Sequence, residues 1–247
     1  MKTNGLLTTI RGKIILLVCS GLVVVGLVAL GMSVYSLKKR GDDELNNIRV
    51  TMMTEKQEKV KALVMVAARD LETVYEEWKA GKYESEEAAK KAAMTRIGVF
   101  RYGSNGDDYF WINDMEPRMV MHPMKPALDG QDLSGFKDPN GKRLFNEFVR
   151  VCRERGEGYV DYEWPMPGHD NPVPKLSFVK RVKGWDWVIG TGIYLDDVDA
   201  AMSAHGKELE AVLSRQTTVL TVVVLGILAV FIALSVVVSG RTAQPIK

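Results

Sequence analysis

Two long apolar blocks constrain this chain more than any other feature. Residues 14–35 (IILLVCSGLVVVGLVALGMSVY) and 219–238 (VLTVVVLGILAVFIALSVVV) contain no charged side chain. A run of roughly 20 apolar residues is long enough to cross a bilayer as a helix. Basic residues precede the first block, as they do in a signal peptide, but the block is longer than the ~7–15 apolar residues of a cleaved leader. We therefore expect transmembrane helices at 14–35 and 219–238, with a cleaved leader as the alternative for the first.

The positions of Lys and Arg indicate how the chain crosses the membrane. Segment 1–13 contains Lys2, Arg11 and Lys13, and segment 239–247 also carries basic residues. The basic run 38–40 argues for the opposite orientation, but it precedes a long segment, and long segments translocate largely regardless of charge. We expect 1–13 and 239–247 in the cytoplasm and 37–216 outside it. In a bacterium this is a protein of the inner membrane with a periplasmic domain.

Composition excludes several classes of protein. Cys152 is the one cysteine between the two apolar blocks, so the outer segment cannot form an internal disulfide and must depend on its apolar core. The net charge is +2, and no cluster of basic residues with interleaved aromatic residues occurs, so we expect no nucleic acid partner.

Enzyme and metal signals are weak. The three histidines, His122, His169 and His205, lack the spacing of metal ligands. The stretch Gly190-Thr191-Gly192 resembles the start of a dinucleotide fingerprint, but Leu195 stands where a third glycine is needed. We expect no catalytic residue, no metal and no cofactor.

The outer segment alternates between helical and strand patterns. Apolar residues at helical spacing predict one long helix over 41–79 that continues from the first apolar block, and Ser85 is a candidate N-cap for a second helix that closes near Arg101. Further helices are predicted at 143–155 and 195–215. Predicted strands lie at residues 107–113, 118–122, 158–165, 174–182 and 186–194. Successive strands favour an antiparallel sheet of about five strands in an α+β domain.

Several motifs in this segment occur in the order of a known family. They are Arg101-Tyr102-Gly103, Asp108-Tyr109-Phe110-Trp111-Ile112, Met121-His122-Pro123, Asp138-Pro139-Asn140-Gly141, Tyr162-Glu163-Trp164 and Trp185–Tyr194. With them, residues 37–216 resemble the single Cache sensor domain of bacterial methyl-accepting chemotaxis proteins, and segment 239–247 resembles the start of a HAMP linker. The resemblance implies a PAS-like fold, a homodimer, and a cytoplasmic signalling module that acts on a kinase. It also implies a small carboxylate ligand of the acetate, propionate, pyruvate or lactate class.

Seven side chains are candidates for ligand binding: Arg101, Tyr109, Trp111, His122, Tyr162, Trp164 and Lys175. Carboxylates are bound by cations and by hydroxyl or imidazole donors. Residues two apart on a strand share a face, so Tyr109 and Trp111 should point the same way, as should the aromatic residues of 162–164. The resemblance places six of the seven, all but Trp111, at pocket positions. Each also has a structural interpretation: the aromatic residues as core, His122 as a strand end, Lys175 as a solvated edge residue, and Arg101 as a cap on the preceding helix.

The expected function is the sensor portion of a transmembrane chemoreceptor. Two alternatives stay open. The same sensor could control a histidine kinase or a cyclic-dinucleotide enzyme encoded beyond Lys247, or the outer domain could be a membrane-anchored module that binds a protein partner. An exposed aromatic patch would favour this last alternative.

Overall fold

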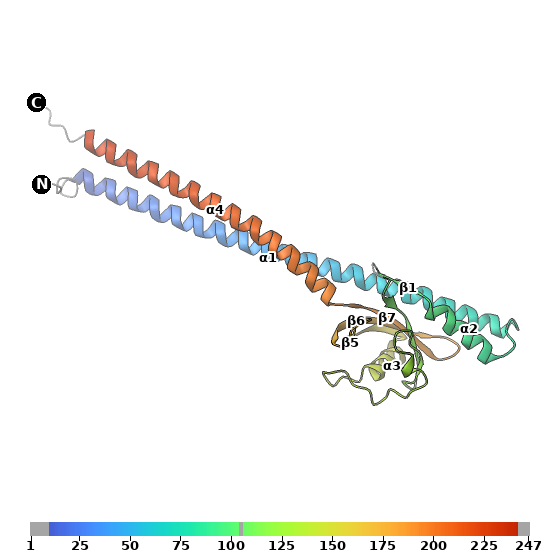
Figure 1. Ribbon diagram of the computed structural model, residues 1–247. Helices are drawn as coiled ribbons and strands as arrows, with labels where there is room; N and C mark the ends of the chain where they lie inside the picture. The colour runs from blue at the N-terminus through green and yellow to red at the C-terminus, as the bar shows by residue number, and fades with distance from the viewer. Residues whose placement is uncertain (1–9, 104–105, 242–247) are drawn as a thin grey trace, which may run out of the picture. The chain divides into compact units, whose positions relative to one another are not determined.

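The computed structural model describes residues 10–103 and 106–241, and its contacts divide the chain into two compact units (Figure 1). One unit contains the residues up to Ile48 and those from Met202 onward, and the other contains Arg49–Ala201. Helices α1 (Ile10–Lys79) and α4 (Asp196–Arg241) contribute residues to both units. Each unit is described separately below.

The first unit is a pair of long helices. Each helix contains an 18-residue stretch that is apolar enough to cross a membrane, with mean hydropathies of 1.9 and 2.3, and neither stretch is buried within the protein. The helices approach closely at two glycines. A Cβ atom at Gly41 would lie 2.7 Å from a methyl carbon of Leu213, and one at Gly26 would lie 3.4 Å from Leu228. By length and composition, both helices are therefore candidate membrane spans; the limits 14–35 and 219–238 stay predictions.

The long helix predicted to continue from the first apolar block is confirmed. Helix α1 runs for 70 residues to Lys79, and Gly81 follows in the left-handed conformation with φ of +80°. No proline interrupts the sequence, and Gly41 lies inside the helix without ending it. Glycine is a common residue just after a helix, because it adopts positive φ without a steric penalty.

The second unit is an α+β domain built on an antiparallel sheet, as predicted. Its five-stranded sheet has the order β4-β3-β7-β6-β5. The remaining elements are β1 (Arg101–Tyr102), β2 (Asp108–Tyr109), β3 (Trp111–Asp114), β4 (Met119–Met121), β5 (Glu157–Pro165), β6 (Pro172–Val182), β7 (Trp187–Tyr194), α2 (Glu86–Gly98), α3 (Leu144–Arg155) and the short 3-10 helix η1 (Pro126–Leu128).

The prediction of one strand over 107–113 is wrong. The chain divides there into β2 and β3, and β2 pairs with β1 in a separate two-stranded sheet. The hydroxyl of Thr191 donates to the carbonyl oxygen of Tyr109. In a continuous strand this carbonyl oxygen would accept from the backbone of a neighbouring strand, but here it accepts from the Thr191 side chain. Helix α2 also differs from the prediction, because it ends at Gly98 rather than near Arg101, and β1 follows it.

The five-stranded sheet separates two apolar cores. One face packs against α1 and α2 and buries Leu71, Ile97 and Phe178. The other face packs against α3 and buries Phe148 and Val179. Figure 1 shows α3 on the side of the sheet opposite α1. The neighbouring residues Phe178 and Val179 of β6 enter opposite cores, as the two-residue period of a strand requires.

The turn between β6 and β7 packs against helix α1. Gly184 in this turn has φ of +109°, and a Cβ atom there would lie 2.6 Å from the Tyr75 ring. The Trp185 ring also meets Tyr75 edge-on, with centroids 5.4 Å apart. The absence of a side chain at Gly184 allows the tip of the hairpin to lie directly on the helix.

Candidate functional site

A small cavity lies between the sheet and α3. It is lined by Tyr109, Trp111, His122, Leu144, Phe145, Phe148, Tyr162 and Trp164. Its volume of about 10 Å³ is close to the minimum that one water molecule needs. Four of the lining side chains carry a hydrogen-bonding group on an aromatic ring, and a fifth is the imidazole. The cavity is therefore small and apolar, with polar groups at several points of its wall.

Two glycines of β7 leave space for side chains of the neighbouring strands. A Cβ atom at Gly190 would collide with the indole ring of Trp111, and one at Gly192 would collide with the hydroxyl of Ser177. Gly190 therefore lets the Trp111 ring lie flat on the sheet, and Gly192 lets the Ser177 hydroxyl approach the backbone of β7. The Trp111 indole N–H donates to the Asn113 side-chain oxygen at 3.2 Å, which fixes the orientation of the ring.

Lys175 is a buried cation beside this cavity. It lies on β6 directly opposite Tyr162 of β5 and Tyr194 of β7, and only 2% of its surface is exposed. Its Nζ atom is 3.3 Å from the Tyr109 hydroxyl and 3.2 Å from the Tyr194 hydroxyl. The ring centroids of the same two tyrosines lie 4.4 and 4.5 Å from Nζ.

The Lys175 ammonium has no ion-pair partner among the Asp and Glu residues that the structure describes. A buried charge without a counter-ion is unfavourable, and hydroxyl and aromatic contacts compensate for only part of its lost hydration. The tyrosine rings carry a partial negative charge on their faces and therefore hold the cation in place.

His122 supplies a neutral donor. Its Nδ1 atom accepts a hydrogen bond from the backbone N–H of Lys125 at 3.0 Å. Burial, followed by the charges of Lys175 and Lys125, lowers the pKa of the imidazole to about 3. With Nδ1 acting as an acceptor, the proton of the neutral ring is on Nε2. Nε2 makes no hydrogen bond to any residue in the described ranges, so its N–H is free to bind a ligand.

Aromatic contacts join the imidazole to the other candidates. The His122 ring centroid lies 5.0 Å from that of Tyr109 and 5.6 Å from that of Trp164. The Tyr162 hydroxyl pairs with the Ser177 hydroxyl at 2.9 Å, and burial holds the pKa of Tyr162 well above its ordinary value. Tyr109 therefore contacts both the buried cation and the neutral imidazole, and the three groups converge on one region.

Arg101 lies apart from this group. Its side chain is exposed and donates to the carbonyl oxygens of Gly98 and Phe100, both at 2.8 Å. These carbonyls follow the last turn of α2, where unpaired backbone acceptors favour a cation. The structure therefore places Arg101 as a cap, the structural alternative. The other six predicted residues are brought together at the cavity or, for Lys175, directly beside it.

Sequence reasoning missed Tyr194 and Ser177. Both face the same side of the sheet as Lys175, because they lie at paired or alternating positions of β6 and β7. The sequence signal for Tyr194 was out of register by one residue. The predicted turn at residues 183–185 would pair Lys175 with Ile193; in the structure Val182 pairs with Trp187, and this turn, one residue longer, places Tyr194 opposite Lys175.

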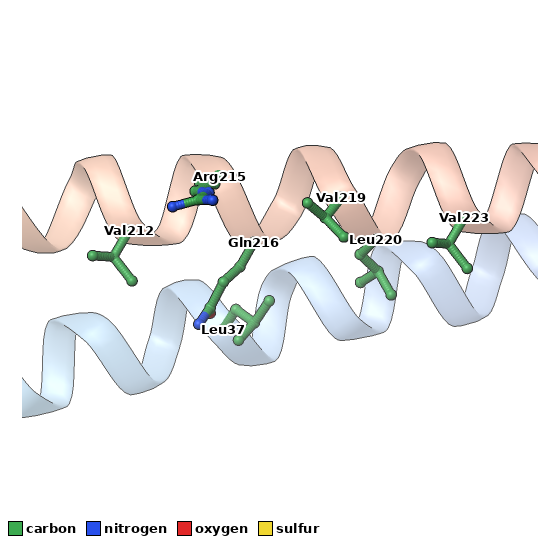
Figure 2. Close-up of a pocket in the computed structure, with 7 residues that line it drawn as sticks. All are labelled: Leu37, Val212, Arg215, Gln216, Val219, Leu220 and Val223. Atoms are coloured by element: carbon green, nitrogen blue, oxygen red, sulfur yellow. The ribbon is translucent and has the colours of Figure 1, made fainter.

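A larger groove of about 610 Å³ lies in the first unit. Figure 2 shows the seven lining residues, with Gln216 extending from α4 towards Leu37 on α1. Apart from Arg215 and Gln216, every lining side chain is aliphatic. Ligand sites usually combine an apolar wall with several convergent polar groups. The groove has two polar side chains among its seven lining residues, whereas five lining residues of the cavity beside Lys175 carry a polar group, so that cavity is the better candidate.

Comparison with known proteins identifies relatives of the chain. The chain is 41% identical over 168 residues to the methyl-accepting chemotaxis protein McpP of Pseudomonas putida, an alignment that covers 68% of this chain and 30% of that protein. It is 28% identical over 224 residues to the sensor histidine kinase MctS of Rhizobium johnstonii, covering 90% of this chain and 47% of the kinase. The chain thus spans less than half the length of either relative.

Two solved structures are each similar to more than half of this chain. One, described as the periplasmic sensor domain of a chemotaxis protein, shares 52% identity with a TM-score of 0.56 and covers 58% of this chain and 98% of that one. The other, described as the structural basis for carboxylic acid recognition by a Cache chemosensory domain, shares 41% identity with a TM-score of 0.55 and covers 59% of this chain and 97% of that one. The family model described as Single Cache domain 2 matches residues 52–207. The chain therefore belongs to the single Cache domain family.

Proposed function

We propose that residues 37–216 form a periplasmic sensor for a small monocarboxylate, of the acetate, propionate, pyruvate or lactate class. The observation that carries this proposal is the buried Lys175 ammonium, which lacks a carboxylate partner among the described residues. A solved relative at 41% identity is described as recognising carboxylic acids, which supports the ligand class.

The groups around the cavity match one carboxylate. Lys175 provides the charge, and the Tyr109 hydroxyl and the His122 Nε2–H provide neutral donors. Charge-assisted hydrogen bonds of this kind are short and strong. Phe148 and Leu144 present an apolar surface to the carbon chain of the ligand. Trp111, Tyr162 and Trp164 complete the wall.

The same geometry disfavours other anions. A dicarboxylate would need a second buried cation, and His122 is neutral because its pKa is lowered to about 3. An amino acid would place its ammonium group close to Lys175, where like charges repel. We therefore propose a ligand with one negative charge and no positive charge.

Ligand binding requires the cavity to widen. A volume of about 10 Å³ holds no more than one water molecule, whereas acetate has four heavy atoms. Side chains of the wall must therefore move when the ligand enters. A ligand that fits the widened state better than the narrow state shifts the protein towards the widened state. This differential affinity is the source of the signal.

The two apolar helices support a location in the inner membrane, with 1–13 and 239–247 in the cytoplasm. We propose that the chain is a homodimer that controls a cytoplasmic signalling module and its kinase. The higher identity to a chemotaxis protein favours control of chemotaxis. The similarity to a sensor histidine kinase supports direct control of a kinase as a second candidate output.

Calorimetry on the full chain in lipid nanodiscs tests the ligand class. We expect acetate, propionate, pyruvate or lactate to bind, and acetamide, which has nearly the shape of acetate but no charge, to give no heat. Succinate serves as the dicarboxylate control. Failure of all four monocarboxylates to bind, or equal binding of acetamide, would contradict the proposal.

A further inference from the structure

Tyr194 connects the candidate site to helix α4. It is the last residue of β7, and α4 begins two residues later at Asp196. Its hydroxyl accepts a hydrogen bond from Lys175 Nζ at 3.2 Å and donates to the carbonyl oxygen of Pro165 on β5 at 2.9 Å. Tyr194 therefore joins the buried cation, the end of β5 and the end of β7.

The residue after it, Leu195, lies between β7 and α4. The backbone N–H of Leu195 donates to the carbonyl oxygen of Pro174 on β6 at 2.9 Å. The Leu195 carbonyl in turn accepts hydrogen bonds from the backbone N–H groups of Val198 and Asp199, at 2.9 and 3.0 Å. The first turn of α4 is therefore bonded to Leu195, the residue that links it to Tyr194.

We propose that Tyr194 is the positioning residue through which the occupancy of the Lys175 site reaches helix α4. This inference rests on the proposed function, because it requires an anion at Lys175. A carboxylate is a stronger acceptor for an ammonium group than a neutral phenol hydroxyl. When the carboxylate arrives, the ammonium moves towards it and the bond to Tyr194 weakens. The end of β7 is then released from Lys175, and the first turn of α4 moves with it.

The Tyr194 hydroxyl stays protonated in this exchange. Burial, together with the surrounding tyrosines, holds its pKa well above the ordinary value. It can therefore keep donating to Pro165 while it loses the bond from Lys175. The change is a redistribution of hydrogen bonds and requires no proton transfer.

Tyr109 provides a matched comparison. Its hydroxyl also accepts from Lys175, at 3.3 Å, and its ring also lies over the ammonium, at 4.4 Å. However, Tyr109 lies on β2, which does not lead into α4. Tyr194→Phe and Tyr109→Phe each remove one hydroxyl acceptor from Lys175, but only the first interrupts the proposed connection.

The test is hydrogen exchange measured by mass spectrometry on the full chain in nanodiscs, with and without saturating acetate. In the wild type we expect acetate to change the exchange rate of the backbone amides in 195–201 by about fivefold, the effect of losing one hydrogen bond. Tyr194→Phe should leave acetate binding unchanged or tighten it by up to about tenfold, because the bond that it removes is present only without ligand, and it should abolish this change even at saturation. Tyr109→Phe should weaken binding by up to about tenfold, because it removes a donor to the carboxylate, and it should keep the change.

Lys175→Met provides a second test that needs no ligand. It removes the bond to Tyr194, so exchange in 195–201 of the ligand-free variant should resemble that of the wild type with acetate. Circular dichroism confirms that each variant is folded.

The outcomes separate the two proposals. If the wild type binds none of the monocarboxylates, the proposed function fails, and this inference fails with it. If the wild type binds acetate but Tyr194→Phe keeps the change at 195–201, or Tyr109→Phe loses it as well, only this inference is overturned. The inference is also overturned if the amides of 195–201 exchange at the same rate in the ligand-free Lys175→Met variant and in the ligand-free wild type.

Discussion

Replacing Lys175 by methionine should have opposite effects on ligand binding and on ligand-free stability. Methionine has a similar length and no charge. The variant loses the cation that would pair with a carboxylate, and removing one partner of a buried charge pair costs about 2–5 kcal/mol of binding free energy. The dissociation constant should therefore rise at least about 30-fold.

Ligand-free stability should not fall. The variant loses two hydrogen bonds to tyrosine hydroxyls and the contacts with their rings. It also no longer buries a charge that is 2% exposed and has no ion-pair partner in the described part of the chain. Replacement of buried ionic groups by apolar ones is commonly neutral or stabilising by about 1–4 kcal/mol. Tyr194 keeps its bond to Pro165, so its hydroxyl is still satisfied.

Thermal unfolding of the full chain in detergent, with and without acetate, measures both effects. At a ligand concentration 100 times the wild-type dissociation constant, bound ligand stabilises the folded state by about 2.7 kcal/mol, which raises the Tm by about 5–11 °C. For a 30-fold weaker variant at the same concentration the stabilisation is about 0.9 kcal/mol, which raises the Tm by about 2–4 °C.

Lys180→Met is the control. Lys180 lies on the same strand but is bonded to Glu157 and is remote from the cavity lining, so the acetate-induced rise in Tm should stay as in the wild type. A Lys175→Met variant with a lower ligand-free Tm and an undiminished response to acetate would refute the reasoning.

Three further predictions concern the architecture around the site. The pKa of the His122 imidazole is lowered to about 3 in the folded protein. Below pH 6.5 a proton therefore binds preferentially to the unfolded chain. The free energy of unfolding should fall by about 1.4 kcal/mol per pH unit as the pH falls from 6.5 towards 3. Urea midpoints of the wild type and His122→Gln at pH 7.5, 5.5 and 4.5 should diverge below 6.5; parallel curves would contradict this. The Asp138 carboxylate accepts hydrogen bonds from the backbone N–H groups of Lys142 and Glu163, at 2.8 and 3.1 Å. Asp138→Ala should therefore lower the free energy of unfolding in urea by about 2–4 kcal/mol. The control Asp170→Ala, at an exposed position between β5 and β6, should change it by less than about 0.5 kcal/mol. Gly184→Ala should lower the free energy of unfolding by about 2–4 kcal/mol, because the new methyl group clashes with Tyr75 and the positive φ is unfavourable for alanine. The control Gly141→Ala, with a φ of +82° and open space around it, should lower it by only about 1–2 kcal/mol.

Local patterns predicted most of the fold. The spacing of apolar residues indicated α1, and the N-cap at Ser85 is confirmed by the bond from the Ala88 N–H to its hydroxyl. The alternation of residues placed Tyr109 and Trp111 in the same core. These features follow from interactions between residues close together in the sequence, which is why the sequence alone contains them.

The missed features depend on contacts between distant residues. The break between β2 and β3 requires Thr191, which is 82 positions from its acceptor Tyr109. Arg101 could reach either a cavity or the end of α2, and its reach alone does not decide between them. Lys175 reads equally well as an edge residue until β7 and β5 are known to flank it. Charge burial is a property of the assembled sheet.

The contact between Gly184 and Tyr75 holds the turn of the β6–β7 hairpin against helix α1. The hairpin contacts α1 at its turn, beside the pair Val182–Trp187, and its opposite end is seven residue pairs away, where Lys175 pairs with Tyr194 and with Tyr162 of β5. At about 3.4 Å per residue the two ends are about 24 Å apart. A tilt of about 3° about the turn would displace the opposite end by about 1.2 Å, the scale of helix shifts in known switching proteins. A glycine far from the proposed ligand site would then set the point about which the hairpin tilts and the distance that its opposite end moves.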